Sequence, residues 1–361
     1  MELTSASAER RNFHTLDALR GVAAAAVFLR HARDFAGAAL FPSSQLAVDL
    51  FFLLSGFVIC HAYERRLAAG MTARDFMIVR LIRLYPLYIL GTLCGVAVVL
   101  AGLALHKTSV WSPTDLLSAS AFGVVILPCP TMPEIGNLFP LDTAAWSLFW
   151  ELVVNLLYAF TWRWTRSPFA LAAILALSAA GMVAASIHFG STDLGTGWRG
   201  WLGAIPRVGF SFFAGVAAYR VFARLHPIRW RLPVLVLVAL PVAAFLLPVG
   251  AIVPQLLCVA LVFPPLVLLA ASGEPPLVLK RACAFLGATS YALYILQAPL
   301  LLMLEQADQK LLRSALEGAA PLTIVILLPG FLCIAAVADR WFDLPVRRRL
   351  TRLRATPQFA L

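Results

Sequence analysis

Three ionisable side chains, Asp17, Arg20 and His31, lie in an apolar segment near the start of the chain. A charged group inside a membrane costs a few kcal/mol and marks a candidate functional site. On an α-helix, Arg20 and His31 would face the same side, about 16 Å apart. Asp17 stands three residues before Arg20, where it can pair with the guanidinium. The pattern predicts an anion anchor and an imidazole base on one face; a self-neutralising ion pair with an interfacial histidine is the alternative.

Three further side chains could serve the same chemistry. Asp49 opens the next apolar segment at the same membrane side as His31, where it could fix the imidazole tautomer or cap its own helix. Arg80 and Arg83 stand three residues apart in a loop expected before the third segment. Two forked guanidiniums suit a phosphate-rich ligand from the cytosol. Ordinary cytoplasmic anchoring is the alternative interpretation of this arginine pair.

Polar residues also form stripes inside later apolar segments. Helical spacing places two sets of polar residues on one face each: Ser147, Glu151, Asn155 and Tyr158 in one segment, and Ser290, Tyr294 and Gln297 in another. Arg207 lies near the outer end of a third segment. Such stripes could serve only as hydrogen bonds between helices. Their number favours a shared polar tunnel.

These side chains must be positioned by apolar helices, and the composition of the chain indicates that it forms such helices. The chain has 361 residues, of which 61% are hydrophobic and 13% charged, whereas an average soluble domain is about 25% charged. Ten segments approach the about 20 residues that cross a bilayer, at 13–33, 46–64, 84–105, 145–163, 168–188, 204–223, 232–249, 252–271, 282–303 and 321–339. A shorter apolar segment, 116–128, predicts a re-entrant or interfacial helix. We therefore expect an all-α polytopic membrane protein with about ten transmembrane helices.

The distribution of basic residues predicts the orientation. With a cytoplasmic N-terminus, 21 of the 29 Lys and Arg residues fall on the cytoplasmic side and 7 on the outer side, as the positive-inside rule requires. Both termini are then cytoplasmic, and 1–361 forms one integral membrane domain with an N-terminus at 1–12, a bundle at 13–339 and a basic tail at 340–361. This arrangement accounts for the net charge of +11 without nucleic acid.

Neither the cysteines nor the histidines are spaced as a metal site requires. The six cysteines are scattered and include no CxxC motif, so we expect buried thiols without a disulfide framework. The six histidines show no ligand spacing with one another or with acidic residues. No metal is therefore expected.

Seven motifs, in this order, resemble those of the acyltransferase-3 family of membrane O-acyltransferases. They are LDALRGVAAAAVFLRH (16–31), VDLFFLLSGFVI (48–59), RLIRLYPLYIL (80–90), WSLFWELVVNLLY (146–158), RVGFSFFAG (207–215), LGATSYALYILQAPL (286–300) and FDLPVRRRL (342–350). The resemblance runs over nearly the whole chain. It implies a ten-helix inner-membrane enzyme that moves an acyl group, usually acetyl, from cytoplasmic acyl-coenzyme A to a hydroxyl of a carbohydrate or glycolipid.

The resemblance and the residues together predict a reaction path. Arg80 and Arg83, helped by Arg20, hold the coenzyme A phosphates. His31 removes the proton of the acceptor hydroxyl near the periplasmic face, while Asp49 or Glu151 orients the imidazole or a hydroxyl. An acyl-histidine intermediate is left open. The residues expected to shape the bundle or the acceptor site are Asp17, Trp146, Ser147, Tyr158, Arg207, Ser290, Tyr291 and Tyr294.

The chain departs from the family pattern at two positions. Gln297 stands where His is common, so no second base is expected there, and Asp343 stands where Glu commonly precedes x-Pro. The rival function is a membrane transporter of a polar substrate, which inverted repeats would favour, and the sequence shows none. The acceptor, the acyl chain length and the oligomeric state are left open. The expected surroundings are lipids of a bacterial inner membrane.

Overall fold

The structure is a computed structural model that describes residues 12–104, 111–132, 136–225 and 232–355. Every regular element within these ranges is a helix, and one isolated antiparallel bridge joins Asn137 to Gly197. Most of the predicted N-terminal segment 1–12 lies outside the described residues, including Arg10 and Arg11. The end of the predicted tail, 356–361, also lies outside them.

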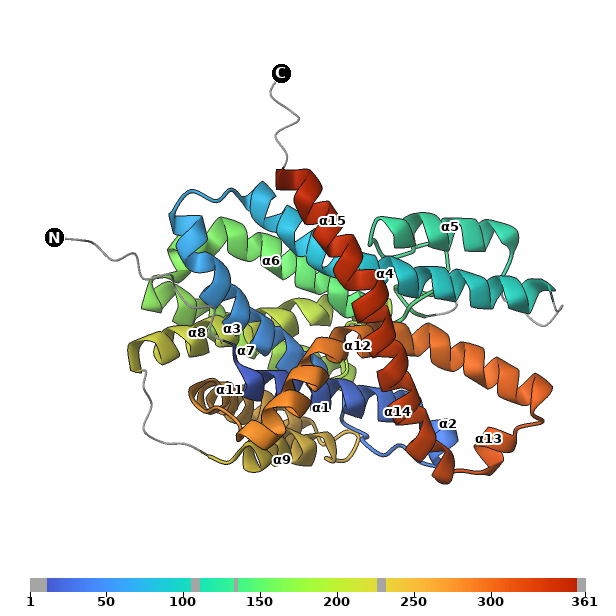
Figure 1. The fold of residues 1–361 in the computed structure, drawn as a ribbon. Helices are drawn as coiled ribbons and strands as arrows, with labels where there is room; N and C mark the ends of the chain where they lie inside the picture. Colours follow the sequence, from blue (N-terminus) through green and yellow to red (C-terminus); the bar gives the residue numbers. More distant parts are fainter. Residues whose placement is uncertain (1–11, 105–110, 133–135, 226–231, 356–361) are drawn as a thin grey trace, which may run out of the picture.

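The described helices follow one another along the chain as shown in Figure 1. They are α1 (His14–His31), α2 (Arg33–Ala36), α3 (Leu46–Ala68), α4 (Ala73–Ala104), α5 (Pro113–Val124), α6 (Ala145–Thr165), α7 (Pro168–Phe189), η2 (Trp201–Gly203), α8 (Ala204–Leu225), α9 (Val234–Phe245), α10 (Ile252–Leu257), η3 (Cys258–Val262), α11 (Phe263–Ser272), α12 (Leu277–Leu311), α13 (Ala315–Gly318), α14 (Leu322–Val337), η4 (Ala338–Asp343) and α15 (Leu344–Ala355).

Seven described helical segments are long and apolar enough to cross a membrane. They do not include α1, which carries Asp17, Arg20 and Arg30 within its 18 residues, or α6. They also exclude α9, whose 12 residues extend for about 18 Å, less than the about 30 Å of a hydrocarbon core. The chain is therefore a multi-pass helical protein. Ten crossings and cytoplasmic termini stay predictions.

Two predicted elements begin earlier than the sequence suggested. The helix α4 starts at Ala73, so Arg80 and Arg83 lie on a helix and not in a loop. The short helix predicted at 116–128 is α5, which starts at Pro113 because Ser112 caps it and forms a capping box with Asp115. Proline is well suited to this first helical position. In Figure 1, α5 lies alongside α4.

Glycines allow the central helices to approach one another closely. The helix α1 packs mainly on α12, where a Cβ at Gly21 would overlap Leu286 and a Cβ at Gly287 would overlap Asp17. The helices α3 and α8 cross in the same way through Gly56 and Gly215, each of which faces the backbone of the other helix. Gly56 and Gly215 therefore serve close packing of these two helices. These two crossings hold α1 and α3 in the interior.

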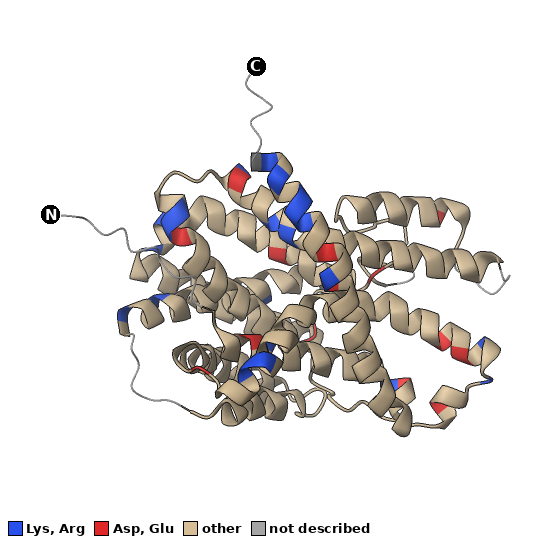
Figure 2. Cartoon of the chain, in the orientation of Figure 1, with Lys and Arg blue, Asp and Glu red and all other residues tan. Residues whose placement is uncertain are grey.

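Charged residues are unevenly placed over this bundle. Figure 2 shows Lys and Arg gathered along α15 and near the C-terminal end of α3, while most of the remaining helices carry few charges. Both regions belong to the side that the sequence predicts as cytoplasmic. The six cysteines are free, but only Cys60, Cys129 and Cys283 are buried as expected, whereas Cys94 and Cys258 are partly exposed and Cys333 is exposed.

Candidate active site

A cavity of about 380 Å³ lies among α1, α3, α4, α6 and α12. This is within the usual size range of small-molecule sites. Its polar lining consists of Arg20, Ser55, Arg80, Arg83, Ser147, Glu151, Ser290, Tyr291 and Tyr294. The sequence predicted all of these except Ser55 as site residues. The fold thus brings the polar stripes of α6 and α12 to the same cavity as the three arginines.

Glu151 and Arg80 form an ion pair in the wall of this cavity. The carboxylate oxygen Oε1 of Glu151 accepts hydrogen bonds from Arg80 Nη2 at 3.0 Å, Ser55 Oγ at 2.5 Å and Asn155 Nδ2 at 3.2 Å. The side chains of Arg80 and Glu151 are 15% and 13% exposed. A largely desolvated pair of this kind is held firmly, because removal of either partner leaves an uncompensated charge.

Arg83 pairs with a second carboxylate, that of Asp343 near the C-terminal end of the chain. The guanidinium of Arg83 donates from Nη1 to Asp343 Oδ2 at 3.3 Å and lies over the ring of Tyr291, 5.8 Å from its centroid. The hydroxyl of Tyr291 donates in turn to the carbonyl of Leu84 at 2.6 Å. Arg83 is therefore oriented from two sides while it lines the cavity. The sequence identified Asp343 only as a departure from the family pattern and missed this contact.

Arg20 reaches the cavity from α1. Its Nη1 lies 3.4 Å from Asp17 Oδ1, and both side chains are about a third exposed. The predicted pair between them is therefore present, although Asp17 itself does not line the cavity. The hydroxyls of Ser147 and Tyr294 are 2.9 Å apart elsewhere in the lining. These groups add hydrogen-bonding capacity to a largely apolar space.

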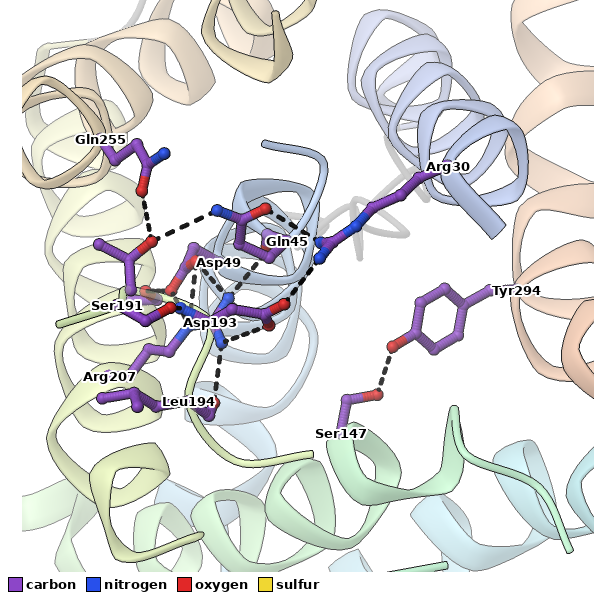
Figure 3. A network of polar contacts seen from close by, with 12 residues as sticks. Arg30, Gln45, Asp49, Ser147, Ser191, Asp193, Leu194, Arg207, Gln255 and Tyr294 are labelled. Carbon is purple, nitrogen blue, oxygen red and sulfur yellow. Dashed lines mark hydrogen bonds and ion pairs between the residues drawn. The ribbon is translucent and has the colours of Figure 1, made fainter. Parts of the chain in front are cut away.

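Asp49 and Arg207 form a buried pair outside the cavity, as shown in Figure 3. Both side chains are 2% exposed, and three contacts of 2.8 to 3.1 Å join them. Ser211 also donates to Asp49, and the Arg207 guanidinium lies over the ring of Trp146. Both carboxylate oxygens of Asp49 are thus engaged. The expectation that Asp49 orients the His31 imidazole is wrong in this structure, because Arg207 takes the carboxylate instead.

The same network ties a loop to the helix ends. Arg207 donates to the backbone carbonyls of Gln45 and Leu194, and Arg30 donates to Gln45 and to Asp193. The sequence missed Gln45 and Asp193, because isolated polar residues in loops carry no periodic signal. The network fixes the segment after α7 against the start of α3 and the end of α1.

His31 lies apart from the cavity. It is the last residue of α1 and is exposed. Within the described ranges, no hydrogen bond joins its imidazole to Asp49 or Glu151, and His31 does not line the cavity. The geometry therefore separates the candidate base from the arginines, as expected for two ends of one helix.

The remaining predicted residues have packing roles in this structure. Tyr158 is fully buried against Phe212 and lies outside the cavity. Ser290 lines the cavity but donates to the carbonyl of Gly287. Gln297 is also fully buried, and its Nε2 donates to the carbonyl of Tyr294. The stripes on α6 and α12 thus divide between cavity lining and contacts within the bundle.

Comparisons with known proteins identify the family of the chain. Residues 13–340 match the model of the acyltransferase-3 family, which is described as an acyltransferase domain. Over 188 residues the chain is 42% identical to "Protein 2 in picA locus" of Rhizobium radiobacter, a match that covers 49% of this chain and 96% of that protein. Over 148 residues it is 31% identical to "Exopolysaccharide production protein ExoZ" of Rhizobium meliloti, covering 40% of this chain and 44% of that protein. No solved structure matches. Because the family match covers most of its length, the chain belongs to the acyltransferase-3 family and is a membrane O-acyltransferase.

Proposed function

We propose that this enzyme takes an acyl group, acetyl in the simplest case, from acyl-coenzyme A on the cytoplasmic side and transfers it to a carbohydrate hydroxyl near the periplasmic face. The observation that carries the proposal is the convergence of Arg20, Arg80 and Arg83 on one cavity. Guanidiniums suit phosphate groups because their planar N–H forks match phosphate oxygens. The donor phosphates bind at these arginines, and the acyl-pantetheine arm extends into the cavity.

His31 acts at the far end of this path. His31 lies eleven residue steps along the α-helix from Arg20, which corresponds to about 16 Å, a span that the pantetheine arm can bridge. The imidazole accepts the proton of the acceptor hydroxyl while the hydroxyl oxygen forms a bond to the thioester carbonyl carbon. The carbon–sulfur bond then breaks, and the coenzyme A thiolate leaves and takes up a proton.

Glu151 has a supporting role on this path. It binds Arg80 and Ser55 within the cavity and so holds the arginine toward the incoming donor. With Asp49 engaged by Arg207, Glu151 is the remaining predicted carboxylate that faces the donor path. It positions the arginine rather than the imidazole.

The acceptor class rests on one relative. The name of the Rhizobium meliloti protein refers to exopolysaccharide production, and we infer a polysaccharide, or its lipid-linked precursor, as the acceptor here. The path from a cytoplasmic donor to an outer base means that the acyl group crosses the membrane during the reaction.

Acetyl transfer in vesicles tests the proposed function. Purified protein in lipid vesicles receives acetyl-coenzyme A labelled in the acetyl group on one side and an oligosaccharide acceptor on the other. Labelled, alkali-labile ester on the acceptor is the expected product. Transport of unmodified oligosaccharide without ester formation would support the rival transporter function and contradict the proposal.

A further inference from the structure

The C-terminal part of the chain forms one long helix that passes the donor arginines. The helices α14 and α15 are joined without a break by the π-helical turn η4, Ala338–Asp343, so that Leu322–Arg354 is a single helical segment. In Figure 1 it crosses the face of the bundle beside α12 and α4. π-helical turns are rare in proteins, and those that occur often lie at functional sites. The turn ends at Asp343.

Asp343 joins this helix to the cavity wall. Its side chain is completely buried, and its Oδ2 accepts from Arg83 Nη1 at 3.3 Å and from Arg347 Nη1 at 2.7 Å. Among the described residues no donor reaches its other oxygen, Oδ1. One carboxylate therefore gathers two guanidiniums, one of which lines the cavity.

Among the described residues, this arrangement leaves N–H donors of both arginines without an acceptor. Each guanidinium carries five N–H donors, and Arg83 and Arg347 share a single oxygen of Asp343. Their side chains are 30% and 25% exposed, so part of each fork is open to a ligand. Arg20, which pairs with Asp17, lines the cavity together with Arg83. Partly exposed guanidiniums with open N–H donors suit a ligand with several phosphate oxygens.

We propose that the C-terminal helix completes the donor site, with Arg347 as a further phosphate-binding residue and Asp343 as the positioning residue that directs Arg83 toward the cavity. This inference rests on the proposed use of acyl-coenzyme A as donor. It assigns the terminal D-L-P segment and the start of α15 to recognition of the phosphate-rich end of the donor.

Binding of acetyl-coenzyme A to Arg347→Ala tests the first part. Calorimetry on the full-length protein in detergent is expected to show that Kd rises about tenfold or more, as for a lost charged hydrogen bond. Binding of S-acetyl-pantetheine, which lacks the nucleotide phosphates, is expected to stay unchanged. The matched control is Arg354→Ala, because Arg354 lies on the same helix but binds the exposed Asp75. Equal effects on both donors, or equal effects of both variants, would overturn the assignment of Arg347.

Asp343→Asn distinguishes positioning from charge. If Asp343 only offset positive charge, its neutralisation would tighten binding of the anionic donor. If it positions Arg83, the same change weakens binding, and we expect Kd for acetyl-coenzyme A to rise. Asp343→Glu keeps the charge and is expected to restore most of the affinity and a wild-type melting temperature. Tighter binding by Asp343→Asn, or Glu and Asn variants that bind equally, would overturn the positioning role.

Arg83→Ala separates this inference from the proposed function. Loss of donor binding in Arg83→Ala, with wild-type binding in Arg347→Ala and Asp343→Asn, would leave acyl-coenzyme A as donor and exclude the C-terminal helix from its site. If the wild-type protein itself does not bind acetyl-coenzyme A, the proposed donor fails and the inference fails with it.

Discussion

His31 is the side chain on which the proposed chemistry depends most directly. It is exposed at the end of α1, next to Arg30, whose guanidinium binds Asp193. An exposed imidazole is accessible to an acceptor that arrives from the outer side. Arg20, one of the arginines proposed to bind the donor, lies toward the other end of the same helix. The two halves of the reaction are therefore distinguishable by substitution.

We predict that His31→Ala lowers acetyl transfer by about 10²–10⁴-fold, the usual cost of removing a general base. Donor binding is expected to stay at the wild-type level, since His31 does not line the cavity. The measurement is acetyl transfer by purified variants in vesicles. His188→Ala serves as control, because His188 is another exposed histidine near the end of a helix. Undiminished transfer by His31→Ala would refute the assignment.

Arg80 and Arg83 are predicted to act on the donor. Replacement of either arginine by Ala is expected to raise KM for acetyl-coenzyme A and to leave KM for the acceptor unchanged. Lys is expected to rescue only partly, because it keeps the charge but loses the planar fork. Initial rates with each substrate varied in turn provide the measurement. A change confined to the acceptor KM would mean that the direction of transfer is reversed.

Asp142, which the sequence did not single out, is predicted to make stability depend on pH. It is 2% exposed in the turn before α6, and burial raises the pKa of its carboxyl from 3.8 to about 8. The folded state holds this proton while the unfolded chain releases it, so the free energy of unfolding falls as the pH rises from about 4 to about 8. Asp142→Asn is expected to flatten this slope and to raise Tm at pH 8.

Thermal unfolding in detergent across that pH range checks the prediction for Asp142. Asp34→Asn is the control, because Asp34 is exposed and paired only with the exposed Arg33. Its slope is expected to match that of the wild type. A wild-type slope for Asp142→Asn as well would show that this carboxyl does not titrate as described.

At the scale of elements, the pair of Asp49 and Arg207 joins α3 to α8 and to the segment after α7. Arg207 reaches the carbonyls of Gln45 and Leu194 in addition to the carboxylate. Asp49 and Arg207 are buried, and the arginine donates a hydrogen bond to each of these groups. The pair stabilises this part of the bundle and does not line the cavity.

We therefore predict that Arg207→Leu destabilises the fold by about 3–5 kcal/mol, because it leaves the Asp49 carboxylate buried without its positively charged partner. The measurement is the unfolding midpoint in detergent. Replacing both residues, as Asp49→Leu with Arg207→Leu, is expected to recover part of the loss. Arg33→Leu is the control, since the exposed pair that it breaks contributes little. A wild-type midpoint for Arg207→Leu would contradict this structural role.

At the scale of the whole molecule, the predicted orientation places donor and acceptor on opposite sides. On a background without the six native cysteines, Ala39→Cys and Arg199→Cys are expected to react with membrane-impermeant thiol reagents added outside cells. Ala69→Cys, in the turn between α3 and α4, is expected to react only after the membrane is opened. All three positions are exposed in the structure. Labelling of Ala69→Cys from outside would reverse both the topology and the direction of transfer.

The sequence by itself determined the helical class and most of the cavity lining. In lipid, an apolar segment of spanning length satisfies its backbone hydrogen bonds by forming a helix. Polar residues within such a segment stand out because their burial in the membrane is costly. Helical spacing was enough to place Ser147 and Glu151 on one face and Ser290 and Tyr294 on another. It also identified the contact between Asp17 and Arg20, which depends only on neighbouring turns of one helix.

Only the tertiary structure decided which charges pair across the bundle. The sequence paired Asp49 with His31 because both are expected at the same depth in the membrane. The crossing of α3 with α8 instead places the Asp49 carboxylate in an ion pair with Arg207. Asp343 meets Arg83 across 260 residues of chain, a contact that no local pattern encodes. Depth and helix face follow from periodicity, whereas partners depend on how helices pack and rotate against one another. Close approaches at Gly56 and Gly215 fix that packing, and only the three-dimensional fold reveals it.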